Sequence, residues 1–186
     1  MEESAEERRP AAVVIPIFAD PPHEVVFIER ATHLRRHAGQ IAFPGGAVDA
    51  EDDGDLARTA LRELHEEIGI PPAAVRIVDQ LPMIRQARNI FNVTTFVGVV
   101  EPGTPLVVDR NEAAAAFRVP LAAIVTPGAV RPGVEVREGL HIKTMLFDYG
   151  TMHVWGLTGS ILEEFTRRYR EAGSCLRASL EARLRL

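Results

Sequence analysis

The sequence predicts a single α/β domain of the α+β kind, with several strands and few helices. Residues 11–18 and 93–100 are apolar and rich in β-branched side chains, which is typical of buried strands. Residues 55–68 instead place apolar side chains at helical spacing, between turn-forming residues and a glycine. The chain has 186 residues, of which 46% are hydrophobic and 25% charged, as in a globular domain large enough for a core. We therefore expect one domain over residues 1–186, with a polar and flexible segment at 1–10.

The sequence before the helix expected at 55–68 predicts strands and turns. The strand at 11–18 contains Pro16, which indicates either a bulge or an edge position because proline has no N–H for a sheet. A turn at 20–23 leads to a second strand at 24–30, so the two strands can form a hairpin. The run Phe43–Gly46 predicts a tight turn, because proline fixes φ and the two glycines tolerate dihedrals that other residues avoid.

The predicted helix has clear start and stop signals. Residues 49–53 are rich in aspartate, a good helix cap, so the helix is expected to begin near Asp53–Asp55. Gly69 suits the left-handed conformation that ends helices, and the prolines at 71 and 72 prevent continuation. An apolar stripe along this helix is formed by Ala57, Leu61, Leu64 and Ile68.

The second half of the chain alternates predicted strands and helices. Strands are expected at 75–81, 93–100, 106–108 and 140–149. Helical segments are expected at 111–117, as a capped turn, at about 153–172, and at 174–186. Residues 82–92 predict a loop, and residues 126–139, rich in Pro and Gly, predict either a loop or a hairpin. Leucines spaced by four give the last helix an apolar face that packs either on the domain or on a partner.

Three glutamates on the first helix carry the first functional signal. Glu63, Glu66 and Glu67 lie at i, i+3 and i+4 and share one face, and we call them the box glutamates. Crowded carboxylates repel one another, at ~0.2–0.5 kcal/mol per exposed pair. A hard divalent cation such as Mg²⁺ or Mn²⁺ would compensate this repulsion. The alternative is that the box glutamates form the solvated side of an amphipathic helix.

The residues around these glutamates resemble a known motif. Residues 62–70 read Arg-Glu-Leu-His-Glu-Glu-Ile-Gly-Ile and resemble, at every position, the end of the Nudix box, Gly-x5-Glu-x7-Arg-Glu-U-x-Glu-Glu-x-Gly-U, in which U is aliphatic. The first half of the box departs from the pattern. Asp52 stands where the box has Glu, and nine residues instead of seven separate it from Arg62. The resemblance therefore assigns no role to Asp52 but keeps the helical acids.

The resemblance to the Nudix family implies a fold, a reaction and a metal. The fold is a mixed β-sheet sandwiched between α-helices, and the reaction is hydrolysis of a pyrophosphate bond in a nucleoside diphosphate derivative. The box glutamates would be catalytic and would hold one or more Mg²⁺ or Mn²⁺ ions, while Arg62 would orient a glutamate through a salt bridge. Gly45 and Gly46 would let the backbone approach metal and phosphate closely.

A second resemblance lies just upstream of the box. This segment has Arg30-Ala31, then Arg35, then Gly39, and then Phe43-Pro44-Gly45-Gly46. The spacing of these residues is similar to a motif that precedes the Nudix box in coenzyme A pyrophosphatases, with Ala31 in place of a serine. This resemblance implies coenzyme A or an acyl-CoA as substrate, and the substrate-binding candidates are Arg30, Arg35, Gly39, Phe43, Gly45 and Gly46. Taken alone, the arginines are also compatible with an ordinary surface loop. The alternative substrates are ADP-ribose, NADH or a nucleoside triphosphate, and the alternative of another class is a nucleotide-binding Nudix module without catalysis.

One further acid is a candidate for catalysis. Glu112 precedes the predicted helical turn, in a region from which some Nudix proteins draw an additional acidic ligand or base. The alternative is a glutamate that is favoured at a helix start by the helix dipole. The residue that accepts the proton of the attacking water is therefore either one of the box glutamates or Glu112.

Composition and charge narrow the class of protein. The net charge of −5 argues against a general nucleic-acid binder but allows a small nucleotide substrate. No apolar run approaches the ~18 residues of a membrane span, and the N-terminus lacks a signal-peptide pattern, so we expect a cytoplasmic protein with no membrane partner. The lone Cys175 cannot form an internal disulfide. Family resemblance makes a homodimer a further expectation. The alternative to the Nudix interpretation is that residues 43–70 are an acidic helix in an unrelated fold.

Overall fold

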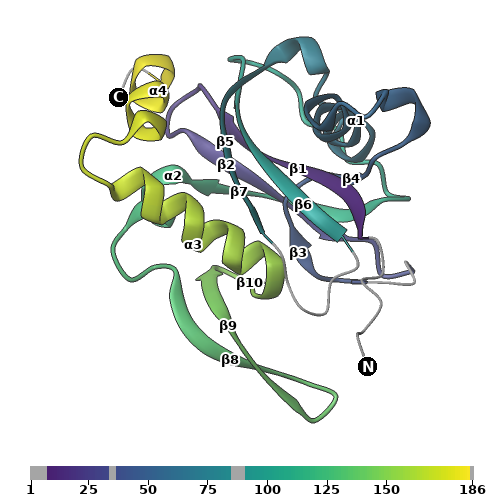
Figure 1. Cartoon of the computed structure of the whole chain (residues 1–186), viewed down its shortest axis with the longest axis vertical. Helices are drawn as coiled ribbons and strands as arrows, with labels where there is room; N and C mark the ends of the chain where they lie inside the picture. The colour runs from purple at the N-terminus through teal and green to yellow at the C-terminus, as the bar shows by residue number, and fades with distance from the viewer. Residues whose placement is uncertain (1–7, 34–36, 85–90, 185–186) are drawn as a thin grey trace, which may run out of the picture.

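A mixed β-sheet forms the centre of the molecule (Figure 1). The computed structural model describes residues 8–33, 37–84 and 91–184. Within these ranges the sheet has seven strands in the order β3-β2-β1-β6-β5, while β4 also pairs with β1 and β7 with β2. Strands β1 and β6 are parallel and the other pairs antiparallel. The strands are β1 Arg9–Phe18, β2 Glu24–Arg30, β3 Ile41–Ala42, β4 Gly45–Ala47, β5 Val75–Ile84, β6 Phe91–Val100 and β7 Ala113–Pro120.

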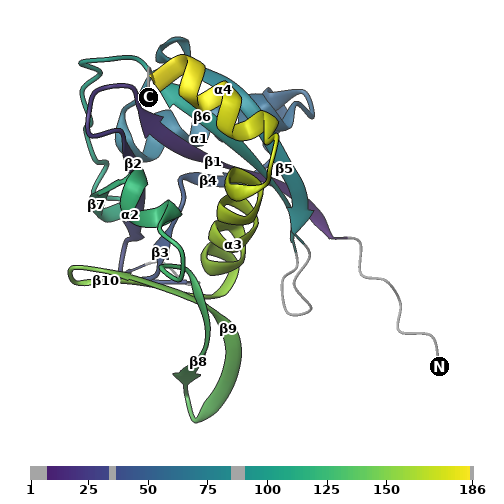
Figure 2. The ribbon, with the colours of Figure 1, turned by 90° about the vertical axis from the view of Figure 1, so that its left-hand side faces the viewer.

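Helices cover both faces of this sheet, as Figures 1 and 2 show. In the described part of the chain the α-helices are α1 Leu56–Ile68, α2 Leu121–Val125, α3 Gly156–Arg170 and α4 Cys175–Leu184. One apolar core lies between α1 and the sheet, and the other packs α2, α3 and α4 against the opposite face. The predicted mixed sheet between helices is confirmed. In the described part of the chain, no helix combines the length and apolarity needed to cross a bilayer.

A second, three-stranded sheet projects from the body below α3 (Figures 1 and 2). Its strands are β8 Arg131–Arg137, β9 Leu140–Tyr149 and β10 Met152–Val154. Strands β8 and β9 form the hairpin that was one of the two interpretations of residues 126–139. At its base His153 Nδ1 lies 2.5 Å from Asp148 Oδ1 and His153 Nε2 lies 3.0 Å from Glu135 Oε2. The hydrogen bond with Asp148 and, to a smaller extent, the one with Glu135 raise the pKa of His153.

Strand β1 lies inside the sheet, so the expected bulge or edge at Pro16 is wrong. The parallel register with β6 continues without a shift through the pair of Pro16 and Gly98. On its other side, β1 pairs with β4 over residues 11–13 and with β2 at Ile17. Pro16 stands between these two partners, where its missing N–H interrupts neither of the two pairings. Strand β1 also begins at Arg9, so the last two residues of the expected flexible segment belong to the sheet, while residues 1–7 lie outside the described ranges.

The capping signals of α1 were predicted correctly. The side chain of Asp55 accepts hydrogen bonds from the N–H groups of Ala57 and Arg58 at the helix start. At the other end, Gly69 adopts φ 72° and donates its N–H to the His65 carbonyl. These local signals fix the helix within one residue of the expected start, and its apolar side packs on the sheet.

The region 106–117 was predicted wrongly. Residues 113–117 form the first part of β7, which pairs with β2, instead of a helical turn. Alanine favours helices locally, but pairing with a neighbouring strand overrides that preference here. Residues 106–108 are not a strand, because the N–H groups of Val107 and Asp109 donate instead to the Ile68 and Glu67 carbonyls at the end of α1.

Three smaller boundaries also differ from prediction. The expected tight turn at 43–46 is a bend at Pro44 followed by β4, whose backbone pairs with β1. At the two ends of the expected loop at 82–92, β5 continues to Ile84 and β6 starts at Phe91, and residues 85–90 lie outside the described ranges. The helix expected from residue 153 begins at Gly156, after β10, and ends at Arg170.

Candidate active site

The box glutamates lie where α1 packs against β4, and two glycines make this close approach possible. The Gly45 N–H donates to Glu67 Oε2 over 3.0 Å. A Cβ on Gly46 would lie 2.4 Å from the Glu63 carboxylate, and a Cβ on Gly45, whose φ is 151°, would lie 2.3 Å from the Ala12 carbonyl oxygen. Glycine at 46 therefore lets the backbone lie against the Glu63 carboxylate, and glycine at 45 lets β4 lie against β1. The approach of this backbone to metal and phosphate stays a prediction.

Glu67 is buried, so the interpretation of all three box glutamates as a solvated face is wrong. Its side chain is 3% exposed, and its nearest cation is Arg30, with Nη1 3.7 Å from Oε1. Burial, only partly offset by the Gly45 N–H, raises the pKa of Glu67 to about 8. A buried carboxylate with one distant countercharge destabilises the fold, and groups of this kind cluster at functional sites.

Glu63 and Glu66 are more exposed and share one arginine. Arg62 Nη1 donates to Glu63 Oε1 over 3.0 Å and to Glu66 Oε2 over 2.9 Å. The salt bridge through which Arg62 was expected to orient a glutamate is present, and it includes a second glutamate. The orienting role itself stays a prediction. Arg62 also supplies part of the positive charge that the sequence argument attributed to a metal alone. Even so, burial raises the pKa of Glu63, against the opposing effect of Arg62.

Asp52 anchors Arg62, a role that the sequence did not assign. The Asp52 carboxylate is fully buried and accepts from Arg62 Nε over 2.9 Å and from Arg62 Nη2 over 3.0 Å. The Thr59 hydroxyl and the Asp49 N–H also donate to it, over 2.8 and 2.9 Å. The Arg62 guanidinium holds the pKa of Asp52 well below its usual range, and Asp52 in turn raises that of Arg62.

The altered spacing of the box explains why this contact was missed. Asp52 ends a short 3₁₀ helix, Ala50–Asp52, and the next residues, Asp53 and Gly54, have φ values of 53° and 76°. This left-handed turn takes up chain length before the Asp55 cap. Asp52, which is shorter than the Glu of the box pattern and is followed by a longer connection, therefore still reaches Arg62. In the sequence this contact was indicated by nothing more than one aspartate among several.

Glu112 faces the same cluster from another segment. No helix begins near it, because residues 110–112 form a turn before β7, so its interpretation as a helix-start glutamate is wrong. Its negative charge is among the causes, after burial, that raise the pKa values of Glu63 and Glu67. Glu112 therefore lies near enough to Glu63 and Glu67 for the charges to interact.

The predicted substrate-binding residues have different surroundings. Arg30 ends β2 at an irregularity of the β2–β7 pairing, and its buried Nε has no hydrogen-bond partner among the residues that the structure describes. Gly39, with φ 67°, is exposed and donates its N–H to the Arg30 carbonyl over 3.0 Å. Phe43 is only 3% exposed and stacks on Phe27 at 4.7 Å, so it has almost no surface for a substrate and serves the core. Arg35 lies outside the described residues.

The donor set fits a hard divalent cation, although the carboxylates are not already gathered around one point. In residues 8–33, 37–84 and 91–184, no three His, Cys, Asp or Glu side chains are arranged as a ready metal site. Glu63 and Glu66 are both bonded to Arg62 Nη1 instead. The surplus of carboxylate oxygens beside a buried Glu67 is the chemistry that Mg²⁺ and Mn²⁺ prefer. The box glutamates would hold the ion.

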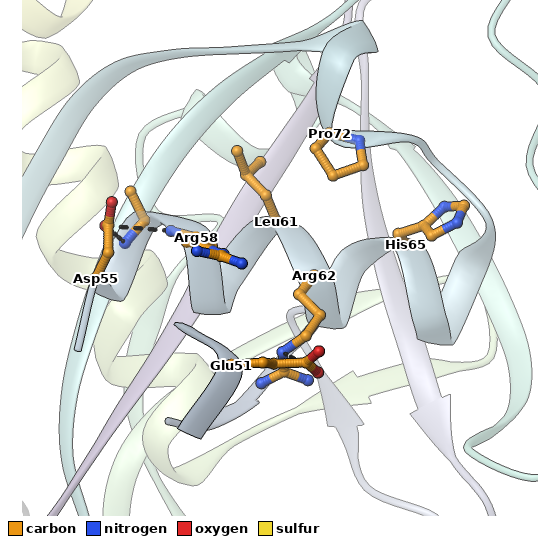
Figure 3. Close-up of a pocket in the computed structure, with 8 residues that line it drawn as sticks. Glu51, Asp55, Arg58, Leu61, Arg62, His65 and Pro72 are labelled. Carbon is orange, nitrogen blue, oxygen red and sulfur yellow. Dashed lines mark hydrogen bonds and ion pairs between the residues drawn. The ribbon is translucent and has the colours of Figure 1, made fainter. Parts of the chain in front are cut away.

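A separate groove lies on the outer side of α1 (Figure 3). Its volume is about 520 Å³, and its lining mixes apolar and charged side chains: Glu51, Asp55, Ala57, Arg58, Leu61, Arg62, His65 and Pro72. Arg62 is shared with the cluster described above, but none of the box glutamates lines the groove. The groove therefore lies beside the acidic cluster and does not contain it.

Comparison with known proteins decides the family. The chain matches the NUDIX domain over residues 7–137, which is more than half of its length. The chain belongs to the Nudix hydrolase family. The alternative of an acidic helix in an unrelated fold is thereby excluded.

The relatives of this Nudix hydrolase agree with its fold. It is 41% identical over 157 residues to "Uncharacterized Nudix hydrolase NudL" of Salmonella paratyphi B, a match that covers 84% of this chain and 81% of that protein. A MutT/nudix family protein from Enterococcus faecalis matches with TM-score 0.57 and 15% identity, over 99% of this chain and 76% of that one. A MutT protein from Methanosarcina mazei matches with TM-score 0.56 and 18% identity, over 88% and 96%. These two structures support the fold alone.

Family membership gives the general chemistry of this Nudix hydrolase. Such enzymes hydrolyse pyrophosphate bonds in small nucleotide derivatives and generally use divalent metals such as Mg²⁺ or Mn²⁺.

Proposed function

We propose that this Nudix hydrolase cleaves coenzyme A or an acyl-CoA. The products would be 4′-phosphopantetheine, or its acyl form, and adenosine 3′,5′-bisphosphate. One observation carries the proposal: the segment that resembles the coenzyme A pyrophosphatase motif begins beside the box glutamates, with Arg30 Nη1 3.7 Å from Glu67 Oε1. A cationic side chain at this position suits a substrate with a diphosphate and a further phosphate.

The residues of the chain divide the chemistry among them. Mg²⁺ or Mn²⁺ held by the box glutamates would neutralise the diphosphate and make a bound water more acidic. Arg30, whose buried Nε has no hydrogen-bond partner among the described residues, would bind a phosphate oxygen, and glycine at 45 and 46 would let the backbone approach metal and phosphate closely. Glu112 or a box glutamate would accept the proton of the attacking water. Phosphoryl transfer of this kind depends on positioning and charge neutralisation more than on covalent chemistry.

The test is a panel of substrates with matched variants. Coenzyme A, ADP-ribose, NADH and a nucleoside triphosphate are incubated with Mg²⁺, with Mn²⁺ or with EDTA, and products are separated by chromatography. Glu67→Gln removes the buried carboxylate, whereas Glu163→Gln, at an exposed position on α3, makes the same change away from the cluster.

Each outcome of the panel has a distinct meaning. Coenzyme A cleavage that requires metal, falls ~10²-fold or more in Glu67→Gln and persists in Glu163→Gln supports the proposal. Faster cleavage of another substrate keeps the Nudix reaction but refutes the coenzyme A assignment. No metal-dependent cleavage in the panel favours either a binding module without catalysis or a substrate outside the panel. The cytoplasmic location and the homodimer stay predictions.

A further inference from the structure

A short turn connects the backbone of Glu67 to Glu112. We call residues 109–113 the Glu112 turn. At its start, the Asp109 N–H donates to the Glu67 carbonyl over 3.0 Å. Within it, the Asp109 carbonyl accepts from the N–H groups of Glu112, over 3.1 Å, and Ala113, over 2.9 Å. The main chain of Asp109 thus bonds to the residue that bears the buried carboxylate and to the residue that bears the fourth acid.

The side chain of Asp109 closes the same turn. Its Oδ1 accepts from the Asn111 N–H over 2.9 Å and from Asn111 Nδ2 over 3.0 Å. An aspartate that binds the backbone two residues ahead is a common way to fix an exposed turn. Asp109, Asn111 and Glu112 are all exposed, so this bond holds the shape of a surface segment and is not part of the core.

The far end of the turn is tied to the segment that carries Arg30. The Ala31 N–H donates to the Glu112 carbonyl over 3.0 Å, and β7 begins immediately afterwards. The backbone of Glu112 is therefore held from one side by α1, through Asp109, and from the other by the end of β2. Inside residues 109–113 the side-chain hydrogen bonds are those of Asp109 with Asn111, while Arg110 Nη1 donates to the Ala114 carbonyl just beyond the turn.

We propose that Asp109 is a positioning residue that fixes the Glu112 turn, so that the Glu112 carboxylate faces Glu63 and Glu67 and takes part with them in phosphoanhydride hydrolysis. This inference rests on the proposed function for its chemistry, but it holds for any pyrophosphate substrate that the enzyme cleaves. Without the Asp109 acceptor the turn samples more conformations, and Glu112 spends less time at its working position.

A double-mutant cycle tests whether Asp109 acts through Glu112. The variants are Asp109→Ala, Asp109→Asn, Glu112→Gln and the Asp109→Ala/Glu112→Gln pair. Asparagine keeps the Oδ1 acceptor, so Asp109→Asn should behave like the wild type. Asp20→Ala is the matched control, because the Asp20 side chain also accepts a backbone N–H, from Gly103 over 2.8 Å. Asp20 follows the C-terminal end of β1, whereas β4 pairs with the other end of that strand.

The expected result is a loss of kcat that vanishes when Glu112 is already absent. Asp109→Ala should lower kcat ~10- to 100-fold with little change in KM, as a small misplacement of a catalytic group does. The same substitution in the Glu112→Gln background should change kcat less than ~2-fold, since residues that act as a unit are not additive. Equal losses in both backgrounds, equal losses for Ala and Asn, or a similar loss in Asp20→Ala would overturn the proposal.

A second readout separates this inference from the proposed function. Mn²⁺ affinity is measured by calorimetry on the same variants without substrate. Asp109→Ala should weaken Mn²⁺ binding in the wild-type background and have no further effect beside Glu112→Gln, whether or not coenzyme A is the substrate. If the wild type cleaves another member of the panel, the kinetic cycle uses that substrate. If it cleaves none, an Mn²⁺ affinity that is unchanged in Asp109→Ala, or equally weakened in both backgrounds, refutes the positioning role.

Discussion

The pair of Asp52 and Arg62 should hold the acidic cluster together, and Asp52→Asn tests this. Asp52 is fully buried, and its carboxylate binds both Nε and Nη2 of Arg62. Asparagine has nearly the same shape but presents an NH₂ group where one carboxylate oxygen accepts. The substitution therefore turns one of these hydrogen bonds into a contact between two donors and leaves the Arg62 charge without its buried partner.

The size of the effect follows from the burial of the pair. Breaking a buried ion pair by neutralising one partner costs ~3–5 kcal/mol of unfolding free energy. For a chain of this length, each kcal/mol lowers Tm by roughly 2–4 °C, so Tm should fall by about 6–20 °C. Asp53→Asn is the matched control, because its side chain is 82% exposed and its partner Arg58 is 56% exposed, and it should stay within ~0.5 kcal/mol of the wild type.

The difference in unfolding free energy between wild type and Asp52→Asn should depend on pH in a defined direction. The pKa of Asp52 is lowered in the folded protein, so its contribution is present above the unfolded value of ~3.9 and is lost as pH falls further. Urea unfolding of wild type and Asp52→Asn, followed by circular dichroism, should show a constant difference from pH 8 to about 5. The difference should shrink in stronger acid. A difference below ~1 kcal/mol at pH 7, or one that grows in acid, would refute the reasoning.

Three further predictions concern other parts of the molecule. Gly46→Ala should displace the Glu63 carboxylate, which its Cβ would meet at 2.4 Å, and lower kcat ~10-fold or more while circular dichroism shows little change in Tm. The raised pKa of His153 stabilises the fold below the unfolded value of ~6.5, so unfolding free energy should decline as pH rises from about 6 to 9, and His153→Gln should flatten that decline in urea titrations. Leu180→Ala should cost ~2–5 kcal/mol because the side chain is fully buried, whereas Leu140→Ala, at 52% exposure, should stay within ~0.5 kcal/mol in the same assay.

The elements predicted well are those whose signals are local. Helix α1 could be placed because Asp55 and Gly69 satisfy its terminal backbone groups, whatever the rest of the chain does. Strand β7 could not, because its alanines favour a helix and only the distant β2 makes them a strand. Pro16 was misjudged for a related reason, since the sequence does not reveal that β1 divides its pairing between β2 and β4.

The box glutamates of the candidate site were predicted, whereas the aspartates that hold neighbouring residues in place were not. Spacing along one helix placed the box glutamates together, but spacing contains no information on depth, so the burial of Glu67 was unexpected. Asp52 and Asp109 were missed because the contacts of each are made across a turn, and Asp52 also lies among several aspartates of similar appearance. A search for acids that could reach Arg62 after a loop insertion would have found the first.

The charges of the cluster show why the buried aspartate matters for the reaction. Arg62 is the cation closest to Glu63 and Glu66, and an arginine that was free to neutralise them would compete with a metal ion for the same oxygens. Asp52 prevents this, because it already balances the Arg62 charge through two hydrogen bonds and leaves only Nη1 for the glutamates. The box glutamates and Glu112 therefore keep a net negative charge that Arg30 alone does not cancel. A divalent cation cancels most of that remainder, so the pair that stabilises the fold also preserves the affinity of the cluster for the ion.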